Sequence, residues 1–298
     1  MSVTSPVRIA LLTLALALFA SLAVAPTTAS AQSTGTAFPV WDTWEWADAD
    51  TATIHPGVQT RVEGGQCTSN FVFVQVEAID GVEYLTDVLL GYAGHCAAST
   101  TNADECTDVA YPVGHPVEVQ GADTIASVAY NASLTMRRIG ETDTATCMNN
   151  DFGLVRIARA DWDAVNPSVP VFGGPVALER GGTDAGELVY SWGNSSLRFG
   201  IEQTSPKRGL SLGTGNGGWN HNVFTVTPGI PGDSGSGYMD ADGNALGVVS
   251  TVEVAPFPAS NNVTDLALSM DYVVVNEPGL ANLRLVSGTE AFDDGAIL

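Results

Sequence analysis

The chain has 298 residues, of which 33 are acidic and 11 are basic, so its formal net charge at pH 7 is −22. This charge argues against nucleic acids and anionic membranes as partners, because both would repel the protein. Lys207 is the only lysine, so a basic patch could form only from scattered arginines.

The first 31 residues have the features of an export signal. Arg8 supplies positive charge, an apolar run extends from Ile9 to Ala25, and Ala29-Ser30-Ala31 has the small-x-small pattern that signal peptidase requires. We predict cleavage after Ala31, because a cut after Ala25 would leave a proline directly beyond it. The alternative is an uncleaved membrane anchor, for which the apolar run is short against a span of about 20 residues.

Residues 32–53 precede the main pattern of the chain and are rich in small, acidic and aromatic residues. This extension could be a short pro-segment, a surface strap or a disordered arm. At the other end, residues 290–298 are acidic, and we expect a loose tail there.

From Ile54 onward, short β-branched and aromatic runs alternate with Gly, Pro, Asn and Asp, which is typical of strands and turns. The predicted strands are Phe71–Val76, Tyr84–Tyr92, Ile125–Tyr130, Phe152–Ile157, Leu188–Trp192, Phe224–Val226 and Ala245–Val254. One helix is predicted, around Leu266–Asn276. Many short strands with glycine-rich turns indicate an all-β sandwich or barrel.

The four cysteines are Cys67, Cys96, Cys106 and Cys147. In an exported chain they suggest two disulfides, although sequence alone permits three pairings. A zinc site is the competing interpretation, and the absence of a close C-x-x-C pair argues against it.

Three local motifs carry chemistry, in this order along the chain: Ala93-Gly94-His95-Cys96, Asp151-Phe152-Gly153-Leu154-Val155 and Gly232-Asp233-Ser234-Gly235. A serine hydroxyl needs a base to become a nucleophile, and histidine can take its proton and return it to a leaving group. A buried carboxylate can hold that histidine in one tautomer. Glycines beside the serine allow backbone N–H groups to converge on an oxyanion. The histidines His55, His115 and His221 have no such context.

These motifs and their order resemble the chymotrypsin-like serine proteases, closest to secreted bacterial members, roughly from Ile54 to Asn276. The protease domain is predicted to span residues 54–298. The resemblance implies two packed six-stranded antiparallel β-barrels with a short C-terminal helix. It implies His95, Asp151 and Ser234 as a catalytic triad and the N–H groups of Gly232 and Ser234 as an oxyanion hole. It also implies the disulfides Cys67–Cys96 and Cys106–Cys147, and neither a metal nor a cofactor.

Two features concern activation. In animal members of this family, a new N-terminal amine pairs with the Asp beside the nucleophile, here Asp233. Arg61-Val62-Glu63-Gly64-Gly65 superficially resembles the required cleavage site, but it lies too close to Cys67 and is interpreted as a hairpin turn. We therefore expect Asp233 to have another partner, such as an arginine. Ser236 and Gly94 are mild departures from the family pattern.

The resemblance also suggests substrate-binding residues. Pro228 stands where an acid would select Arg or Lys before the scissile bond, and Ser250-Thr251-Val252 matches the edge that pairs with substrate backbone. A valine at that third position narrows the pocket, so small or medium apolar side chains are expected.

The expected function is therefore that of a secreted, monomeric serine endopeptidase acting on polypeptides. The competing hypotheses are a catalytically silent binding protein with the same fold and an esterase. An α/β-hydrolase elbow is excluded because Ser236 occupies its final glycine position and no histidine follows in the required place.

Overall fold

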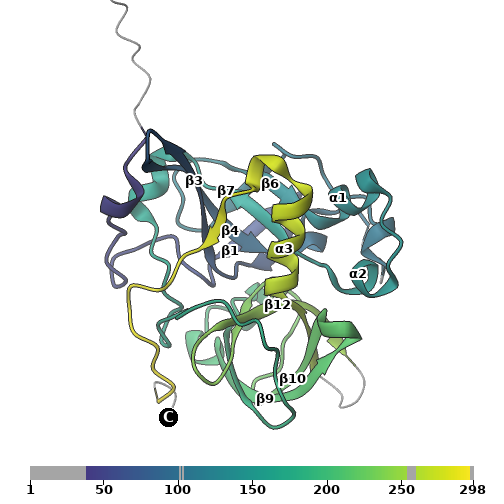
Figure 1. Cartoon of the computed structure of the whole chain (residues 1–298). Coiled ribbons are helices and arrows are strands. Elements are labelled where there is room, and N and C mark those ends of the chain that lie inside the picture. The colour runs from purple at the N-terminus through teal and green to yellow at the C-terminus, as the bar shows by residue number, and fades with distance from the viewer. Residues whose placement is uncertain (1–37, 101, 103, 254–259, 296–298) are drawn as a thin grey trace, which may run out of the picture. The chain divides into compact units, whose positions relative to one another are not determined.

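The computed structural model describes residues 38–295, apart from residues 101, 103 and 254–259 (Figure 1). The predicted export signal, residues 32–37 and the last three residues of the expected tail lie outside the described residues.

Two β-structures make up the described chain. The first is an eight-stranded sheet in the order β14 (Leu283–Leu285), β3 (Val72–Ile79), β4 (Val82–Tyr92), β7 (Gly153–Arg156), β6 (Ala126–Asn131), β5 (Pro116–Val119), β1 (Gln59–Val62) and β2 (Gly65–Thr68). The second is a closed barrel in the order β10 (Asn220–Thr225), β13 (Ser260–Asp265), β12 (Ala245–Glu253), β11 (Gly237–Met239), β8 (Leu188–Trp192) and β9 (Pro206–Gly215). Every strand pairing in both is antiparallel.

The mostly β class, the six-stranded barrel and the C-terminal helix confirm the prediction. The first half differs in detail, because its eight strands form an open curled sheet where six strands in a closed barrel were expected. The two additional edge strands explain the difference: β2 comes from a tight hairpin, and β14 returns from the C-terminus to pair with β3. Figure 1 shows the barrel strands in green beneath this sheet.

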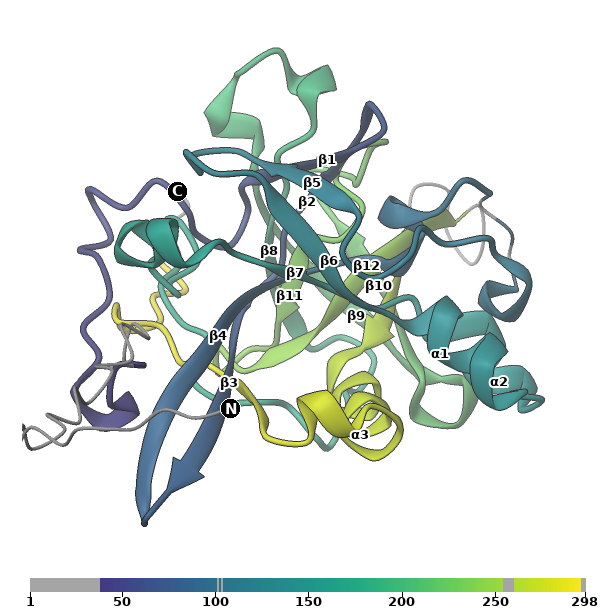
Figure 2. The same cartoon turned by 90° about the horizontal axis from the view of Figure 1, so that it is seen from above.

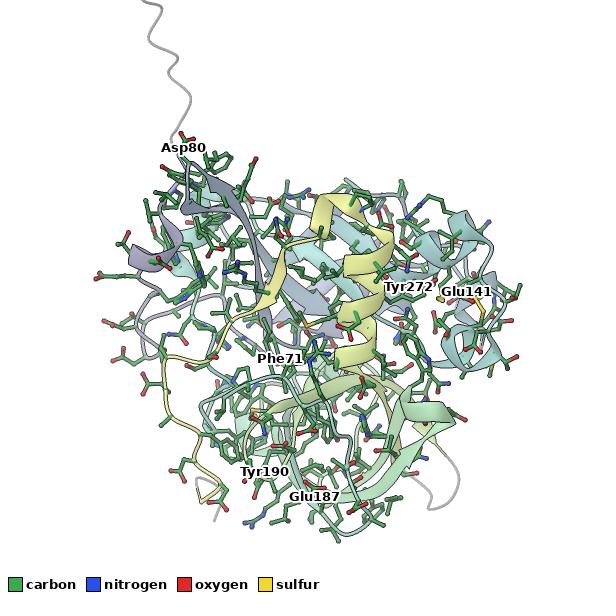
Figure 3. The ribbon with its side chains drawn as sticks, viewed as in Figure 1. Phe71, Asp80, Glu141, Glu187, Tyr190 and Tyr272 are labelled. Carbon is green, nitrogen blue, oxygen red and sulfur yellow. A yellow bond between two sulfur atoms is a disulfide. The ribbon has the colours of Figure 1, made fainter. Side chains whose placement is uncertain are left out.

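Two hairpins show how local sequence sets these strands. Asp80 and Gly81 have φ angles of 51° and 80°, and they connect β3 to β4 at the hairpin tip (Figure 3). Glu63 and Gly64 have φ angles of 48° and 84° between β1 and β2. Acidic-Gly pairs at positive φ suit two-residue turns whose twist matches that of the strands. The second hairpin confirms that the segment around Glu63 is a turn.

The described residues form three α-helices: α1 (Ala132–Ile139), α2 (Thr144–Asn149) and α3 (Leu266–Asn276). Helix α3 has the predicted bounds, and the Asp265 carboxylate caps it by accepting the Leu268 N–H. The Tyr272 hydroxyl of α3 lies 3.1 Å from a carboxylate oxygen of Glu141, which follows α1 (Figure 3). Figure 2 shows α3 beside the sheet, on the side opposite β1 and β5.

The apolar core has three parts. One lies within the eight-stranded sheet, one fills the interior of the barrel, and the third joins the two β-structures through side chains such as Phe71, Tyr190 and Met270. Phe71 packs against Gly237 of β11, where a Cβ atom would come within 2.7 Å of the ring. The sheet and the barrel therefore share buried apolar surface, which fixes the residues at their junction.

Residues 38–53 pack as a strap against the eight-stranded sheet. Trp44 lies edge-to-face against both Trp46 and Trp162, at ring-centre distances of 6.0 and 6.1 Å. Val40 forms a β-bridge with Tyr84. Trp44 and Trp46 are partly buried against the core of the sheet, and aromatic pairs packed in this way contribute beyond their apolar area. This part of the extension therefore belongs to the folded body.

Candidate functional site

His95 lies directly after β4, in a 3-10 helix that spans Gly94–Ala97. The disulfide Cys67–Cys96 ties this turn to β2, and Cys106–Cys147 ties the following loop to α2. These are the two pairings that the resemblance implied. A Cβ atom on Gly94 would lie 3.1 Å from Asp151 Oδ1, which explains why a very small residue precedes His95.

Asp151 follows α2 and has a fully buried side chain. Its Oδ2 atom lies 2.6 Å from His95 Nδ1, and its Oδ1 atom accepts the His95 backbone N–H at 2.7 Å. Burial alone would raise the pKa of Asp151, but the charge and hydrogen bonds of His95, with a hydrogen bond from Ser250, hold it below its ordinary value. The carboxylate is therefore ionised and fixes the imidazole from two directions.

The pKa of the His95 imidazole shifts in the opposite direction to that of Asp151. Burial would lower the pKa of His95, but the charge of Asp151, the hydrogen bond to it and the more distant charge of Asp108 outweigh that effect and raise the pKa. Because Nδ1 faces an ionised carboxylate, Nδ1 carries a proton in the neutral ring and Nε2 is left to accept one. The His95 side chain is 19% exposed, so the ring remains accessible.

Ser234 lies in a turn that docks against the end of β4. The Ser234 carbonyl accepts the Thr68 N–H at 2.8 Å. The next residue, Gly235, has a φ of 88°, and a Cβ atom there would come within 2.9 Å of the Ala93 nitrogen. Only glycine fits this approach without strain. The turn thus brings Ser234 of the barrel to the strand end that leads into His95.

Two serines orient the backbone around Ser234. The Ser195 hydroxyl donates to the Pro231 carbonyl at 2.5 Å, and the Ser236 hydroxyl donates to the Asp233 carbonyl at 2.7 Å. The carbonyl and N–H of a trans peptide point in opposite directions. Because these two carbonyls are fixed by hydrogen bonds, the N–H groups of Gly232 and Ser234 point to the opposite side of their peptides. Within the described residues, neither N–H has a hydrogen-bond partner. Sequence reasoning missed Ser195 altogether.

Asp233 is fully buried and lies between two cations. Arg198 Nη2 and Lys207 Nζ both contact its Oδ2 atom, the latter at 2.5 Å. Burial alone would raise the pKa of Asp233, but the charge of Lys207 and the hydrogen bonds of both cations hold it below its ordinary value. Burial lowers the pKa of Lys207 to about 8, against the opposing pull of Asp233. The expected arginine partner is thus present, and the buried lysine was not expected.

Two carboxyl groups, those of Glu105 and Asp108, lie close together near His95. Glu105 and Asp108 are both buried, and the Ser133 hydroxyl donates to Glu105 at 3.3 Å. Burial, with the charges of Asp151 and Asp108, raises the pKa of Glu105 to about 10. Glu105 is therefore protonated at neutral pH and can donate a hydrogen bond to Asp108. No sequence motif indicated this pair, because the raised pKa of Glu105 results mainly from burial, which local sequence does not show.

Glu105→Gln is expected to stabilise the protein at pH 7 and to leave it nearly unchanged at pH 4. The folded protein retains a proton that the unfolded chain releases above about pH 4.3, so the native Glu105 lowers the free energy of unfolding as pH rises toward neutrality. Glutamine removes this penalty, by about 1–3 kcal/mol at pH 7. Urea unfolding at both pH values measures it, with the exposed Glu118→Gln as control. Equal destabilisation at both pH values would contradict the assignment.

The expected substrate-binding residues lie in two segments, one before and one after Ser234 in the chain. The Pro228 carbonyl accepts from Arg198 Nη2 at 3.2 Å, so its backbone lies beside the Asp233 cluster. The Ser250 side chain is buried, and its hydroxyl helps to lower the pKa of the Asp151 carboxyl. Thr251 and Val252 continue β12 and pair with Asn262 and Asn261 of β13. The Val252 side chain lies outside the described residues.

Metal ligation has little support in the part of the chain that the structure describes. Two groups of side chains are close enough to share an ion, Cys67 with His95 and Cys96, and Asp104 with Cys106 and Cys147. Their cysteines are joined in disulfides and so lack the thiolates that would bind a metal.

Among the described helices, none has the length and apolar character needed to cross a bilayer.

The closed barrel, the curled sheet and the C-terminal helix agree with the architecture that the resemblance to chymotrypsin-like proteases implied, apart from the additional strands of the sheet. The structure is similar to Thermobifida fusca Protease A, with a TM-score of 0.49 and 18% identity over 80% of this chain and 100% of that one. It is similar to a Glu endopeptidase (TM-score 0.48, 11% identity, 77% and 95% covered) and to Cellulomonas bogoriensis chymotrypsin (0.42, 17%, 78% and 98%). No family model and no curated protein matches the sequence.

Proposed function

We propose that this protein is a secreted serine endopeptidase in which His95, Asp151 and Ser234 form the catalytic triad. The observation that carries the proposal is the pairing of His95 with a buried, doubly bonded Asp151, beside a turn that frees two N–H groups around Ser234. A general base, its orienting carboxylate, a hydroxyl and an anion-binding pair are the components of acyl transfer.

The reaction follows from these roles. The Ser234 hydroxyl gives its proton to His95 Nε2 while its oxygen attacks the carbonyl carbon of the peptide bond. The N–H groups of Gly232 and Ser234 bind the oxyanion that develops. The C–N bond then breaks as His95 returns the proton to the leaving amine, which leaves an ester on Ser234. Water, activated by His95, hydrolyses that ester and restores the hydroxyl.

The compartment and substrate belong to the same proposal. The predicted export signal and the two disulfides support secretion, because disulfides persist in oxidising surroundings. Pro228 carries no charge that would select a basic side chain, which supports a small or medium apolar residue before the scissile bond. The protein would act as a monomer on polypeptides.

Ser234→Ala is expected to abolish labelling by a fluorophosphonate probe and to lower peptide hydrolysis by at least about 10³-fold, since the acyl acceptor is lost. Intact mass measures a single stoichiometric adduct on the wild-type protein, and peptide and ester substrates are compared in parallel. Ser287→Ala, at an exposed serine, is the control. A folded wild-type protein that takes no adduct would overturn the proposal in favour of a silent binding protein. Turnover of esters alone would indicate an esterase.

A further inference from the structure

A cavity of about 1170 Å³ opens beside Trp192, and we call it the Trp192 cavity. Its walls come mainly from the strap, the segment that follows β8 and the chain near the C-terminus, within residues 48–59, 166–173, 192–205 and 290–293. None of the proposed triad residues lines it. Cavities that hold organic ligands occupy about 300–1,000 Å³, so this one has room for a ligand with several side chains.

The Trp192 cavity carries negative charge that no cation of the described residues balances. Five exposed carboxylates line it, those of Asp48, Asp50, Glu202, Glu290 and Asp293. Within the part of the chain that the structure describes, none of the five forms an ion pair. Arg198 also lines the cavity, but its side chain is 7% exposed and is paired with Asp233. A concave surface of this charge attracts cations and repels anions.

Two hydrogen-bond acceptors in the wall of the cavity also lack a partner. Ser205 is 4% exposed, and its hydroxyl has no hydrogen-bond partner within the described residues. His55 Nδ1 donates to the Pro56 carbonyl at 2.8 Å. Burial lowers the pKa of His55, against the opposing effect of that hydrogen bond, so the ring is neutral at pH 7 and its Nε2 atom can accept. Because buried polar groups are normally hydrogen-bonded, these two acceptors indicate a ligand that donates.

Both acceptors flank Trp192. The Ser205 carbonyl accepts the N–H of the residue after Trp192 at 2.9 Å, and a Cβ atom on Gly57 would lie 2.2 Å from the Trp192 ring. A guanidinium stacked on an indole gains cation–π attraction and keeps its N–H groups free to donate. The cavity lining also includes Val171 and Ile201, which are 49% and 52% exposed. A ligand that matches this lining combines an arginine side chain with apolar neighbours, as a peptide can and a metal ion cannot.

We infer that the Trp192 cavity binds a peptide segment in which an arginine lies between apolar residues, with the guanidinium on Trp192 and its N–H groups donating to the two unpartnered acceptors. The inference goes beyond the proposed function and does not depend on it. The rim carboxylates attract the segment and accept its remaining donors. Ser195 also lines the cavity, and its hydroxyl donates to the Pro231 carbonyl ahead of Ser234. A bound segment therefore lies against the residues that support the Ser234 turn, at a place separate from the proposed triad.

Calorimetric titration of the Ser234→Ala variant with acetyl-Val-Arg-Leu-Arg-amide tests the inference, because this variant lacks the proposed nucleophile and leaves the peptide intact. One saturable site is expected. Acetyl-Val-Gln-Leu-Gln-amide should bind at least about 10-fold more weakly, since the charge-assisted hydrogen bonds and the cation–π contact are lost. Equal binding of the two peptides, or no binding of the arginine peptide, overturns the inference. A wild-type protein without peptidase activity would contradict only the proposed function.

Two double variants in the same background separate the cavity from the general negative charge of the protein. Asp50→Asn with Glu202→Gln neutralises two carboxylates of the cavity, whereas Asp80→Asn with Glu77→Gln neutralises two exposed carboxylates at the β3–β4 hairpin (Figure 3). At an ionic strength of about 0.15 M, charges more than about 8 Å apart are largely screened. The cavity pair should weaken binding by at least about 10-fold and the hairpin pair by less than about 2-fold. Equal losses would show non-specific attraction, against the inference.

Ser205→Ala tests whether the arginine side chain enters the cavity, because it removes an acceptor without changing the charge. We expect about 10-fold weaker binding, the effect of one hydrogen bond to a charged group, and no change for the exposed control Ser287→Ala. Unchanged affinity in Ser205→Ala would show that the peptide stays at the rim, and the inference would fail. Displacement of the peptide by calcium chloride, but not by sodium chloride of equal ionic strength, would indicate a metal site and overturn it as well.

Discussion

Asp151→Asn is expected to lower kcat/KM for peptide hydrolysis by about 10⁴-fold while the protein remains folded. An amide in place of the carboxylate can present its NH₂ group to His95 Nδ1, which then has to accept. The proton of the neutral ring moves to Nε2, the nitrogen that should take the Ser234 proton. The same change removes the charge that raises the pKa of His95.

The pH profile gives this prediction a second readout. In the wild-type protein, kcat/KM should fall as pH drops through the raised pKa of His95, because the protonated ring cannot act as a base. With Asn at position 151, the residual activity should persist to lower pH. Asp87→Asn, which breaks a half-exposed pair with Arg156 on the same sheet, is the control. A loss of less than about 10-fold, without a pH shift, would contradict the role given to Asp151.

Asp233→Asn is expected to cost about 3–5 kcal/mol of stability and to abolish activity. It leaves Lys207 and Arg198 buried without an anion, at side-chain exposures of 0% and 7%. It also removes the carboxylate that accepts the Ser195 and Ile230 N–H groups, each at 3.1 Å. The turn that carries Ser234 loses its anchor together with its charge balance.

Urea unfolding measures this cost. Asp271→Asn is the matched control, because its partner Arg180 and Asp271 itself are both more than half exposed, and such surface pairs contribute about 1 kcal/mol or less. The double variant Asp233→Asn with Lys207→Met removes one of the stranded charges and should recover part of the stability. Equal effects of the two single Asp variants would show that the buried cluster is not a charge-compensated unit.

The sequence predicted those residues of the site that lie within short contiguous motifs. His95, Asp151 and Ser234 each lie in a short motif. The glycines of these motifs are required by close contacts, such as the approach of Gly235 to Ala93. The residues that support them could not be found in this way. Lys207 reaches Asp233 from 26 positions away, and Ser195 reaches Pro231 from 36. Such contacts depend on the packing of whole strands, which no local pattern encodes.

The fold shows the same division. Strands with long apolar runs were predicted within a few residues, and β8 has the predicted bounds, Leu188–Trp192. The missed elements are short or polar: β14 has three residues, and β1 is Gln-Thr-Arg-Val. Helix α1 was missed because only its capping residues indicate it. The Asn131 side chain accepts the Ser133 N–H at its start, and Gly140 adopts the left-handed conformation at its end. These elements form where tertiary pairing supports them, which explains the extra strands of the sheet.

The cluster around Asp233 has a practical consequence for handling the protein. Because both counter-charges come from within the barrel, on Arg198 and Lys207, the conformation of the Ser234 turn does not depend on a free α-amino group. An affinity tag or fusion partner placed ahead of Phe38 therefore needs no exact, scarless removal. Preparations whose polypeptides start at different positions ahead of Phe38 should have the same specific activity.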